Sequence, residues 1–188
     1  MSEIDWSTWK PKESATLCFV RQELRVLMIR KKRGLGAGKI NGVGGRLEKG
    51  ETPETGIVRE AQEELGIKLL DANRRGELHF QFLDGYSLFC TVFVASRFDG
   101  TPIETPEAVP LWFDLHQLPF DEMWEDDKLW LPEALDGKTF RGFFLFDGDK
   151  MLSQRLEWGR LKERRGGIFN HRFRRLHRLR KWVWRWAG

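Results

Sequence analysis

The chain concentrates carboxylate side chains in one short segment. Glu60, Glu63 and Glu64 follow Arg59, and Glu51 lies in the loop that precedes them. On a helix, residues three and four apart share a face, so Glu60 would lie beside both Glu63 and Glu64. Carboxylates this close repel one another unless a cation lies between them, and Mg2+ prefers oxygen ligands and bridges them to phosphates. The spacing indicates a divalent metal site, with a solvated acidic helix face as the alternative.

The segment that carries these acids has clear helix boundaries. Thr52 is a favourable N-cap, and Pro53 suits the first helical position. Gly66 favours termination. The sequence therefore predicts a helix of about three turns between them. We interpret Arg59 as a residue that orients the neighbouring acids by ion pairing, in preference to one that contacts a substrate.

A glycine-rich stretch precedes the helix, with glycines at positions 34, 36, 38, 42, 44, 45 and 50. Glycine at this density lets the backbone approach a ligand closely. The stretch is not a phosphate-binding P-loop, because Lys39 is followed by Ile40 and the place of the first glycine is taken by Arg33.

The remaining elements predict an α/β domain with a mixed sheet. Apolar, β-prone runs that predict strands lie at residues 15–20, 24–30, 76–85, 86–96, 111–115, 139–147 and 151–158. The first two runs, the middle two and the last two are each expected to pair as hairpins, and Asp84-Gly85 marks the middle turn. A second helix is expected within 118–135.

Length and composition predict one domain with an appendage. We expect a lead-in at 1–14, the domain at 15–158 and a basic extension at 159–188. Cys18 and Cys90 lie in strand-like runs and indicate buried, reduced thiols. No run resembles a signal peptide or is long enough to span a bilayer. The expected location is the cytoplasm, and the expected state is a monomer.

The net charge of +4 hides an uneven distribution. Residues 160–188 hold 11 of the 32 Lys and Arg residues but one of the 28 acids, which leaves a net −6 on residues 1–159. Apolar residues recur in the basic extension close to helical spacing. It could bind an anionic membrane or nucleic acid, or it could pack on the acidic domain or form a partly disordered end.

The stretch from Gly45 to Ile67 resembles the Nudix box. That pattern is a Gly, five residues, Glu, seven residues, Arg-Glu, an apolar residue, any residue, Glu-Glu, any residue, Gly and an apolar residue. Its fixed places are filled by Gly45, Glu51, Arg59, Glu60, Ala61, Glu63, Glu64, Gly66 and Ile67. The resemblance implies the Nudix fold, an α/β/α sandwich around a mixed sheet, and hydrolysis of a pyrophosphate bond.

Residues 14–158 also resemble the animal-type oxidised purine nucleoside triphosphate hydrolases. This resemblance implies Mg2+-dependent hydrolysis, with Mn2+ as an alternative, of substrates such as 8-oxo-dGTP and 2-hydroxy-dATP to the monophosphate and pyrophosphate. The implied metal ligands are Gly44, through its carbonyl, with Glu60, Glu63, Glu64 and Glu107. Glu107 is implied either as a ligand or as a base, and Glu63 or Glu64 is expected to activate water.

The same resemblance places purine recognition at Asn41, Trp124, Asp126 and Asp127. The residue types suit this task, because an indole can stack on a purine and an amide offers both a donor and an acceptor. Two adjacent aspartates in a dry pocket do not both ionise easily, so one can act as a donor. Further implied substrate positions are Thr16, Lys31, Val43, Gly44, Gly45, Arg46, Phe80 and Glu125. Phe82, like Phe80, matches a strand aromatic that lines the pocket in this family, and ordinary core is the alternative for it.

Leu35 departs from a representative of the family that carries Phe there, and it offers less ring area to a nucleotide. Two other functions fit the sequence. The chain could be a Nudix hydrolase for another pyrophosphate, such as an RNA 5′ end or a different nucleoside triphosphate. It could also be a non-catalytic Nudix-fold binding module, although all the acidic residues of the box are present.

Overall fold

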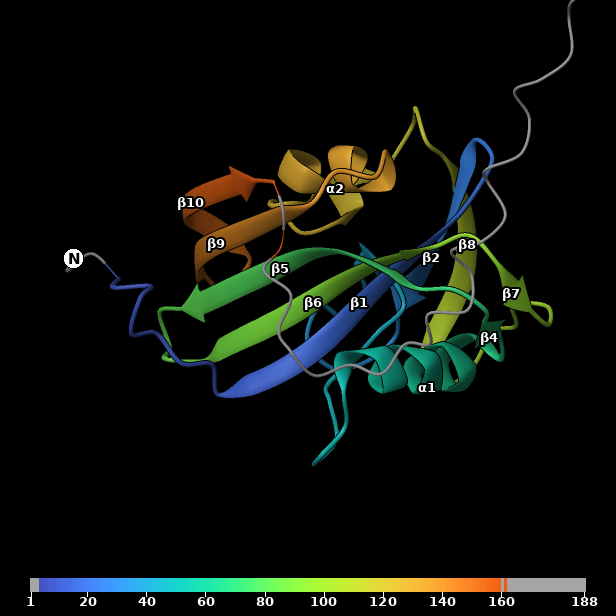
Figure 1. Ribbon diagram of the computed structural model, residues 1–188, viewed down its shortest axis with the longest axis horizontal. Coiled ribbons are helices and arrows are strands. Elements are labelled where there is room, and N and C mark those ends of the chain that lie inside the picture. Colours follow the sequence, from blue (N-terminus) through green and yellow to red (C-terminus); the bar gives the residue numbers. More distant parts are fainter. Residues whose placement is uncertain (1–3, 160, 162–188) are drawn as a thin grey trace, which may run out of the picture.

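The computed structural model describes residues 4–159 and residue 161, and it places a mixed sheet between two helices (Figure 1). The helices are α1 (Pro53–Leu65) and α2 (Asp127–Leu135), and a single 3-10 turn, η1, spans Phe120–Glu122. The strands are β1 (Glu13–Gln22), β2 (Arg25–Lys31), β3 (Ile40–Asn41), β4 (Lys68–Leu69), β5 (Asn73–Phe82), β6 (Ser87–Ala95), β7 (Phe98–Asp99), β8 (Ala108–Asp114), β9 (Phe140–Asp147) and β10 (Lys150–Trp158).

Within the described residues, the main sheet has eight strands. Its order is β10-β9-β5-β6-β1-β2-β3, and β8 also pairs with β2. The β1–β6 and β5–β9 pairs are parallel, whereas the three predicted hairpins, β1–β2, β5–β6 and β9–β10, are antiparallel. Strands β4 and β7 form a separate two-stranded sheet. The predicted hairpins and the mixed sheet are confirmed.

Each face of the sheet packs against its own helix, because side chains alternate along a strand. On one face, Ile57 and Leu65 of α1 pack with Cys18 of β1. On the other, Trp130 of α2 stacks on Phe140 with ring centroids 5.0 Å apart. Burying a side chain of this size stabilises the fold by about 1.5–3 kcal/mol. The expected α/β/α sandwich is confirmed.

Helix α1 begins and ends where the sequence predicts. The hydroxyl of Thr52 accepts from the backbone N–H of Thr55, and the Thr55 hydroxyl accepts in return from the N–H of Thr52. Pro53 occupies the first turn, and Gly66 ends the helix in the left-handed region at φ 69°. Together these caps satisfy backbone groups that would otherwise lack partners at both ends of the helix that carries the acidic cluster.

The segment before β1 packs on the domain. Trp6 lies 5.4 Å from the ring of Phe143, and Trp9 donates from Nε1 to the side-chain oxygen of Gln81 at 2.9 Å. These aromatic residues cover β5 and β9 on the face that α1 occupies elsewhere. Strand β1 itself starts at Glu13, two residues before the expected boundary of the domain.

Two sequence expectations concern the chain outside the sheet. Apart from Gly159 and residue 161, the basic extension at 159–188 lies outside the described residues, as does its expected amphipathic helix. Among the residues that the structure describes, no helix is long and apolar enough to cross a membrane.

Candidate active site

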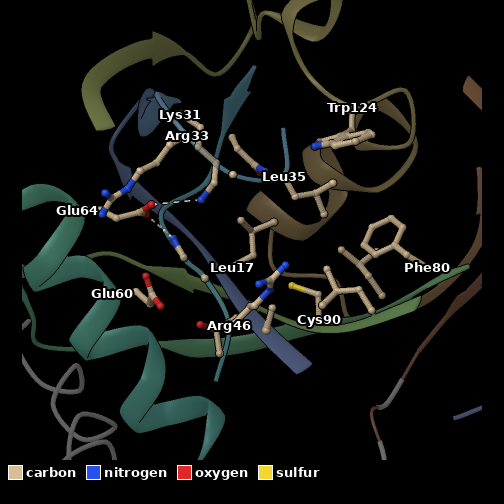
Figure 2. Close-up of a pocket in the computed structure, with 18 of the residues that line it drawn as sticks. Leu17, Lys31, Arg33, Leu35, Arg46, Glu60, Glu64, Phe80, Cys90 and Trp124 are labelled. Atoms are coloured by element: carbon tan, nitrogen blue, oxygen red, sulfur yellow. Dashed lines mark hydrogen bonds and ion pairs between the residues drawn. The ribbon is translucent and has the colours of Figure 1, made fainter. Parts of the chain in front are cut away.

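A cavity of about 480 Å³ opens beside the glycine-rich loop. Its walls come from β1, β2, β5 and β6, from α1 and from the loop that leads into α2. Figure 2 shows Glu60 and Glu64 at one end and Trp124 with Phe80 at the other. One continuous cavity thus joins an acidic end to an aromatic end.

Glu64 is the most deeply buried carboxylate of the acidic end, with 1% of its surface exposed. Its Oε2 accepts from the backbone N–H of Gly44 at 2.9 Å, and Lys31 Nζ lies 3.4 Å from its Oε1. Burial raises the pKa of Glu64 to about 7, against the opposing effects of Lys31 and Gly44. Burial also raises the pKa of Glu60, which Arg59 partly offsets.

Two glycines allow the loop to reach these carboxylates. Gly44 has φ 152°, and a Cβ there would lie 2.1 Å from the backbone oxygen of Thr16 on β1. A Cβ at Gly45 would lie 2.5 Å from Oε1 of Glu60. Only glycine lets the chain run this close to both β1 and α1.

Arg59 links the carboxylates at the acidic end of the cavity. It donates to Glu51 at 2.9 and 2.8 Å, and one of its terminal nitrogens reaches both Glu60 and Glu63 at 2.9 Å. It also donates to the carbonyl of Arg46 at 3.1 Å. The hydrogen bond from Arg59 lowers the pKa of Glu51. This geometry suits a residue that orients carboxylates.

The acidic end fits a hard divalent cation by its chemistry. Glu60 and Glu64 present oxygen ligands to the cavity, and their raised pKa values reflect buried negative charge that a bound cation would stabilise. Glu107, the residue before β8, lines the cavity and is ion-paired with Arg33. As they stand, no three acidic, His or Cys side chains of the described residues are grouped closely enough to hold a metal ion.

The opposite end holds two buried aspartates. Asp126 is 1% exposed and accepts from Nε1 of Trp130 at 2.9 Å, and Asp127 is 3% exposed and accepts from the backbone N–H of Trp124 at 3.1 Å. Burial raises the pKa of Asp126 and of Asp127, and the charge of Asp126 raises that of Asp127 further. The second oxygen of Asp126, Oδ1, is buried without a hydrogen-bond partner among the described residues.

Aromatic rings shape the space around these aspartates. The Trp124 indole meets Phe146 edge to face at 5.6 Å and Phe82 at 6.4 Å. Phe80 stacks on Phe144 at 5.6 Å. Phe82 is 9% exposed, lines the cavity and belongs to the α2-side core, so both of its expected roles apply. Leu35, at 43% exposure, lies at the mouth.

Most residues expected at the site line this one cavity. These are Thr16, Lys31, Asn41, Gly44, Gly45, Arg46, Arg59, Glu60, Glu64, Phe80, Glu107, Trp124, Asp126 and Asp127. The buried hydroxyl of Thr16 has no hydrogen-bond partner among the described residues. The side-chain oxygen of Asn41 accepts from the N–H of Gly42 at 2.8 Å, which fixes the amide.

Three expected site residues have side chains that do not line the cavity. Glu63 points to Arg59, and half of its side chain is exposed. Val43 is buried in the α1-side core, the cluster in which Ile57 and Leu65 of α1 pack on the sheet, and its backbone pairs with Cys18. Glu125 is exposed and accepts from the backbone N–H of Met151 at 3.1 Å. Helical spacing alone could not show that Glu63 turns toward the arginine.

Other lining residues were not expected from the sequence. They include Leu17, Arg33, Leu78, Tyr86 and Cys90. Strand alternation carried a usable signal for Leu78, which lies on the same face of β5 as Phe80. Cys90 gave no such signal, because its place in the wall depends on the pairing of β6 with β5.

The family is shown by comparison with known proteins. A family model for the NUDIX domain matches residues 11–134, and the chain belongs to the Nudix family. This agrees with the resemblance of the box and with the fold.

Individual relatives narrow the comparison. The chain is 42% identical over 138 residues to the oxidized purine nucleoside triphosphate hydrolase of Danio rerio. The aligned residues make up 73% of this chain and 88% of the relative. It is 43% identical over 143 residues to the protein of the same name from Mus musculus, covering 75% and 92%. A crystal structure of a mutator MutT protein from Bacillus halodurans superimposes with a TM-score of 0.69 at 25% identity, over 77% of this chain and 97% of that one.

Proposed function

We propose that the protein hydrolyses oxidised purine nucleoside triphosphates, such as 8-oxo-dGTP and 2-hydroxy-dATP, to the monophosphate and pyrophosphate with Mg2+. One observation carries the proposal: a single cavity joins the buried box carboxylates to an aromatic pocket that ends in two buried aspartates. The names of the Danio rerio and Mus musculus relatives support the same class of substrate.

Base recognition follows from the aromatic end. The flat indole of Trp124 provides a stacking surface, and Asn41 provides an amide to the base edge. Burial raises the pKa of both Asp126 and Asp127, and the charge of Asp126 raises that of Asp127 further. This favours a pair that shares one proton and so offers one donor and one acceptor. Oxidation changes the donor and acceptor pattern of a purine edge, and such a pair can match that change.

Hydrolysis follows from the acidic end. Glu60 and Glu64 would hold the cation, with Glu107, which also lines the cavity, as a further ligand. When bound, Mg2+ neutralises phosphate oxygens and lowers the pKa of a water molecule. Lys31 lines the cavity 3.4 Å from Glu64 and places a positive charge where the phosphates would lie. Arg59 keeps Glu60 oriented.

Water attack then splits the bond between the α- and β-phosphates, releasing monophosphate and pyrophosphate. Of the two glutamates expected to activate the water, Glu64 lines the cavity, whereas Glu63 is directed to Arg59. We therefore assign proton acceptance to Glu64 and assign Glu63 to the ion-pair network of the arginine.

Location and assembly complete the proposal. We place the enzyme in the cytoplasm and expect it to act as a monomer, because the residues assigned to metal binding and to base recognition all come from one chain. Cys18 and Cys90 are both free and buried, which suits a reducing compartment.

A pyrophosphate-release screen tests the function. The full chain would be assayed with Mg2+ against 8-oxo-dGTP, 2-hydroxy-dATP, dGTP and dATP, with an RNA that carries a 5′-triphosphate as a separate arm. We expect kcat/KM to favour the oxidised purines by about tenfold or more, since a buried polar site rejects a mismatched edge. Equal rates on normal and oxidised purines, or turnover of the RNA alone, would reject the substrate. Binding without any turnover would support a non-catalytic module.

A further inference from the structure

Lys39 lies behind the aromatic end of the cavity. Its Nζ is 5.0 Å from the centroid of the Trp124 ring and 3.1 Å from Oδ2 of Asp149 in the β9–β10 turn. Less than a quarter of the Lys39 side chain is exposed. Its backbone is fixed at both ends, because its N–H donates to Gly36 and its carbonyl accepts from Lys31, each at 3.0 Å.

Lys39 does not line the cavity, whereas Trp124 and Asp127 do. The ammonium therefore acts on these residues from outside the space that a substrate would fill. Next to the β9–β10 turn, the N–H of Met151 on β10 donates to Glu125 at 3.1 Å, which ties the start of β10 to the loop that carries Trp124. Lys39 contacts both this loop, at Trp124, and the turn, at Asp149.

Several groups of the described residues interact electrostatically with the two aspartates. The charge of Asp126 acts on Asp127, that of Glu125 acts on Asp126, and the thiol of Cys90 on β6 is influenced by both aspartates. The ammonium of Lys39 contributes the opposing positive charge and lowers the pKa of Asp127, against burial and Asp126, which raise it.

We propose that Lys39 is a positioning residue for base recognition, which holds the Trp124 indole from behind and sets a positive charge beside the twin aspartates. This inference rests on the proposed function. The Asp149 carboxylate is 71% exposed, and an exposed ion pair of this kind contributes little stability by itself. Its effect is to keep the ammonium over the ring, where a partly buried cation attracts the face of an indole.

A titration without nucleotide tests the electrostatic part. The carboxyl carbons of Asp126 and Asp127 would be followed by NMR in the wild type and in Lys39→Met, Lys39→Gln and Lys39→Arg. Loss of the positive charge should raise the apparent pKa values of the pair by about one unit in the two neutral variants. Lys39→Arg should restore them, and Lys68→Met, which changes an exposed side chain on β4, should leave them unchanged.

Steady-state kinetics with 8-oxo-dGTP test the positioning part. We expect the two neutral variants to raise KM about three- to tenfold with kcat within twofold, because base contacts weaken while the acidic end is untouched. The pH profile of kcat/KM should shift to higher pH, in parallel with the carboxyl titration. Lys39→Arg should return KM and the pH profile toward their wild-type values. A merely structural lysine would lower the melting temperature without moving the pH profile.

The two proposals fail in different ways. If the wild type does not hydrolyse oxidised purines, the proposed function is wrong, but the titration still reads the effect of Lys39 on the aspartates. If the carboxyl titrations of Lys39→Met and Lys39→Gln match the wild type, or if KM is unchanged in both, Lys39 has no positioning role.

Discussion

Replacing Asp126 with Asn should stabilise the protein at neutral pH. The wild-type carboxyl is 1% exposed, and burial raises its pKa from 3.8 to about 6, although the hydrogen bond from Trp130 opposes the rise. A buried charge of this kind weakens the fold whenever it is ionised. The amide oxygen of Asn can still accept from the Trp130 indole, so the substitution removes the charge and keeps that contact.

The expected gain in the free energy of unfolding follows from the pKa shift of Asp126. About two pKa units correspond to about 3 kcal/mol at 1.4 kcal/mol per unit. The new amide nitrogen takes the place of the unpartnered Oδ1 and must itself be desolvated, which reduces the net gain to about 1–3 kcal/mol. For a chain of this size, that gain raises the melting temperature by about 2–10 °C.

The stability gained by replacing Asp126 should depend on pH. A carboxyl whose folded-state pKa is raised contributes stability that is fully present below its unfolded pKa, near 4. That stability is lost as the pH rises through about 6. The advantage of Asp126→Asn should therefore be largest at pH 7.5 and vanish near pH 4. Thermal unfolding followed by circular dichroism between these pH values measures it.

A matched control is Asp121→Asn in η1, where the side chain is exposed. It should shift the melting temperature little, and equally at every pH. A lower melting temperature for Asp126→Asn at pH 7.5, or a gain that does not change with pH, would refute the argument that burial of this charge destabilises the fold. The stabilised variant should also lose its preference for oxidised purines.

Three further predictions address the rest of the site. Glu60→Gln should reduce kcat in the pyrophosphate assay by orders of magnitude with an unchanged circular dichroism spectrum, and near-normal turnover would reject the metal assignment. Gly44→Ala should destabilise the fold by several kcal/mol in urea unfolding, because its Cβ would meet the Thr16 carbonyl at 2.1 Å; a loss under 1 kcal/mol would contradict this. Trp124→Ala should raise KM for 8-oxo-dGTP about tenfold or more, through lost stacking of about 1–3 kcal/mol; an unchanged KM would place the base elsewhere.

Local rules predicted the elements that depend on neighbours in the sequence. The caps of α1 at Thr52 and Gly66 appear where propensity places them, and the three hairpins form between adjacent runs. The short strands β3, β4 and β7 were missed, because two residues are too few to show a period. The parallel partners of β1 and β5 could not be read from the sequence, since they join segments far apart in the chain.

The site was predictable where residue type and motif carried the signal. The box carboxylates Glu60 and Glu64 line the cavity, as does the indole of Trp124. The direction in which a side chain points could not be predicted as well from the sequence. Glu63 and Val43 were expected from the motif and its surroundings, yet one faces Arg59 and the other the α1-side core. The role proposed for Lys39 could not be predicted from the sequence, because it depends on an ion pair with Asp149, which lies more than 100 residues further along the chain.

The parallel pairing of β1 with β6 has a consequence for how the chain is made. Glu13 aligns with Leu88, so the edge of β1 that will meet β6 is exposed until the ribosome has released about eighty further residues. The β1–β2 hairpin can close early, but the central sheet must await this distant closure and then that of β9 on β5, which aligns Gly76 with Phe140. Long-range pairing of this kind slows folding and leaves open strand edges for aggregation in the interval. Variants that weaken the hairpin should therefore reduce soluble yield during synthesis more than they reduce the stability of the finished fold.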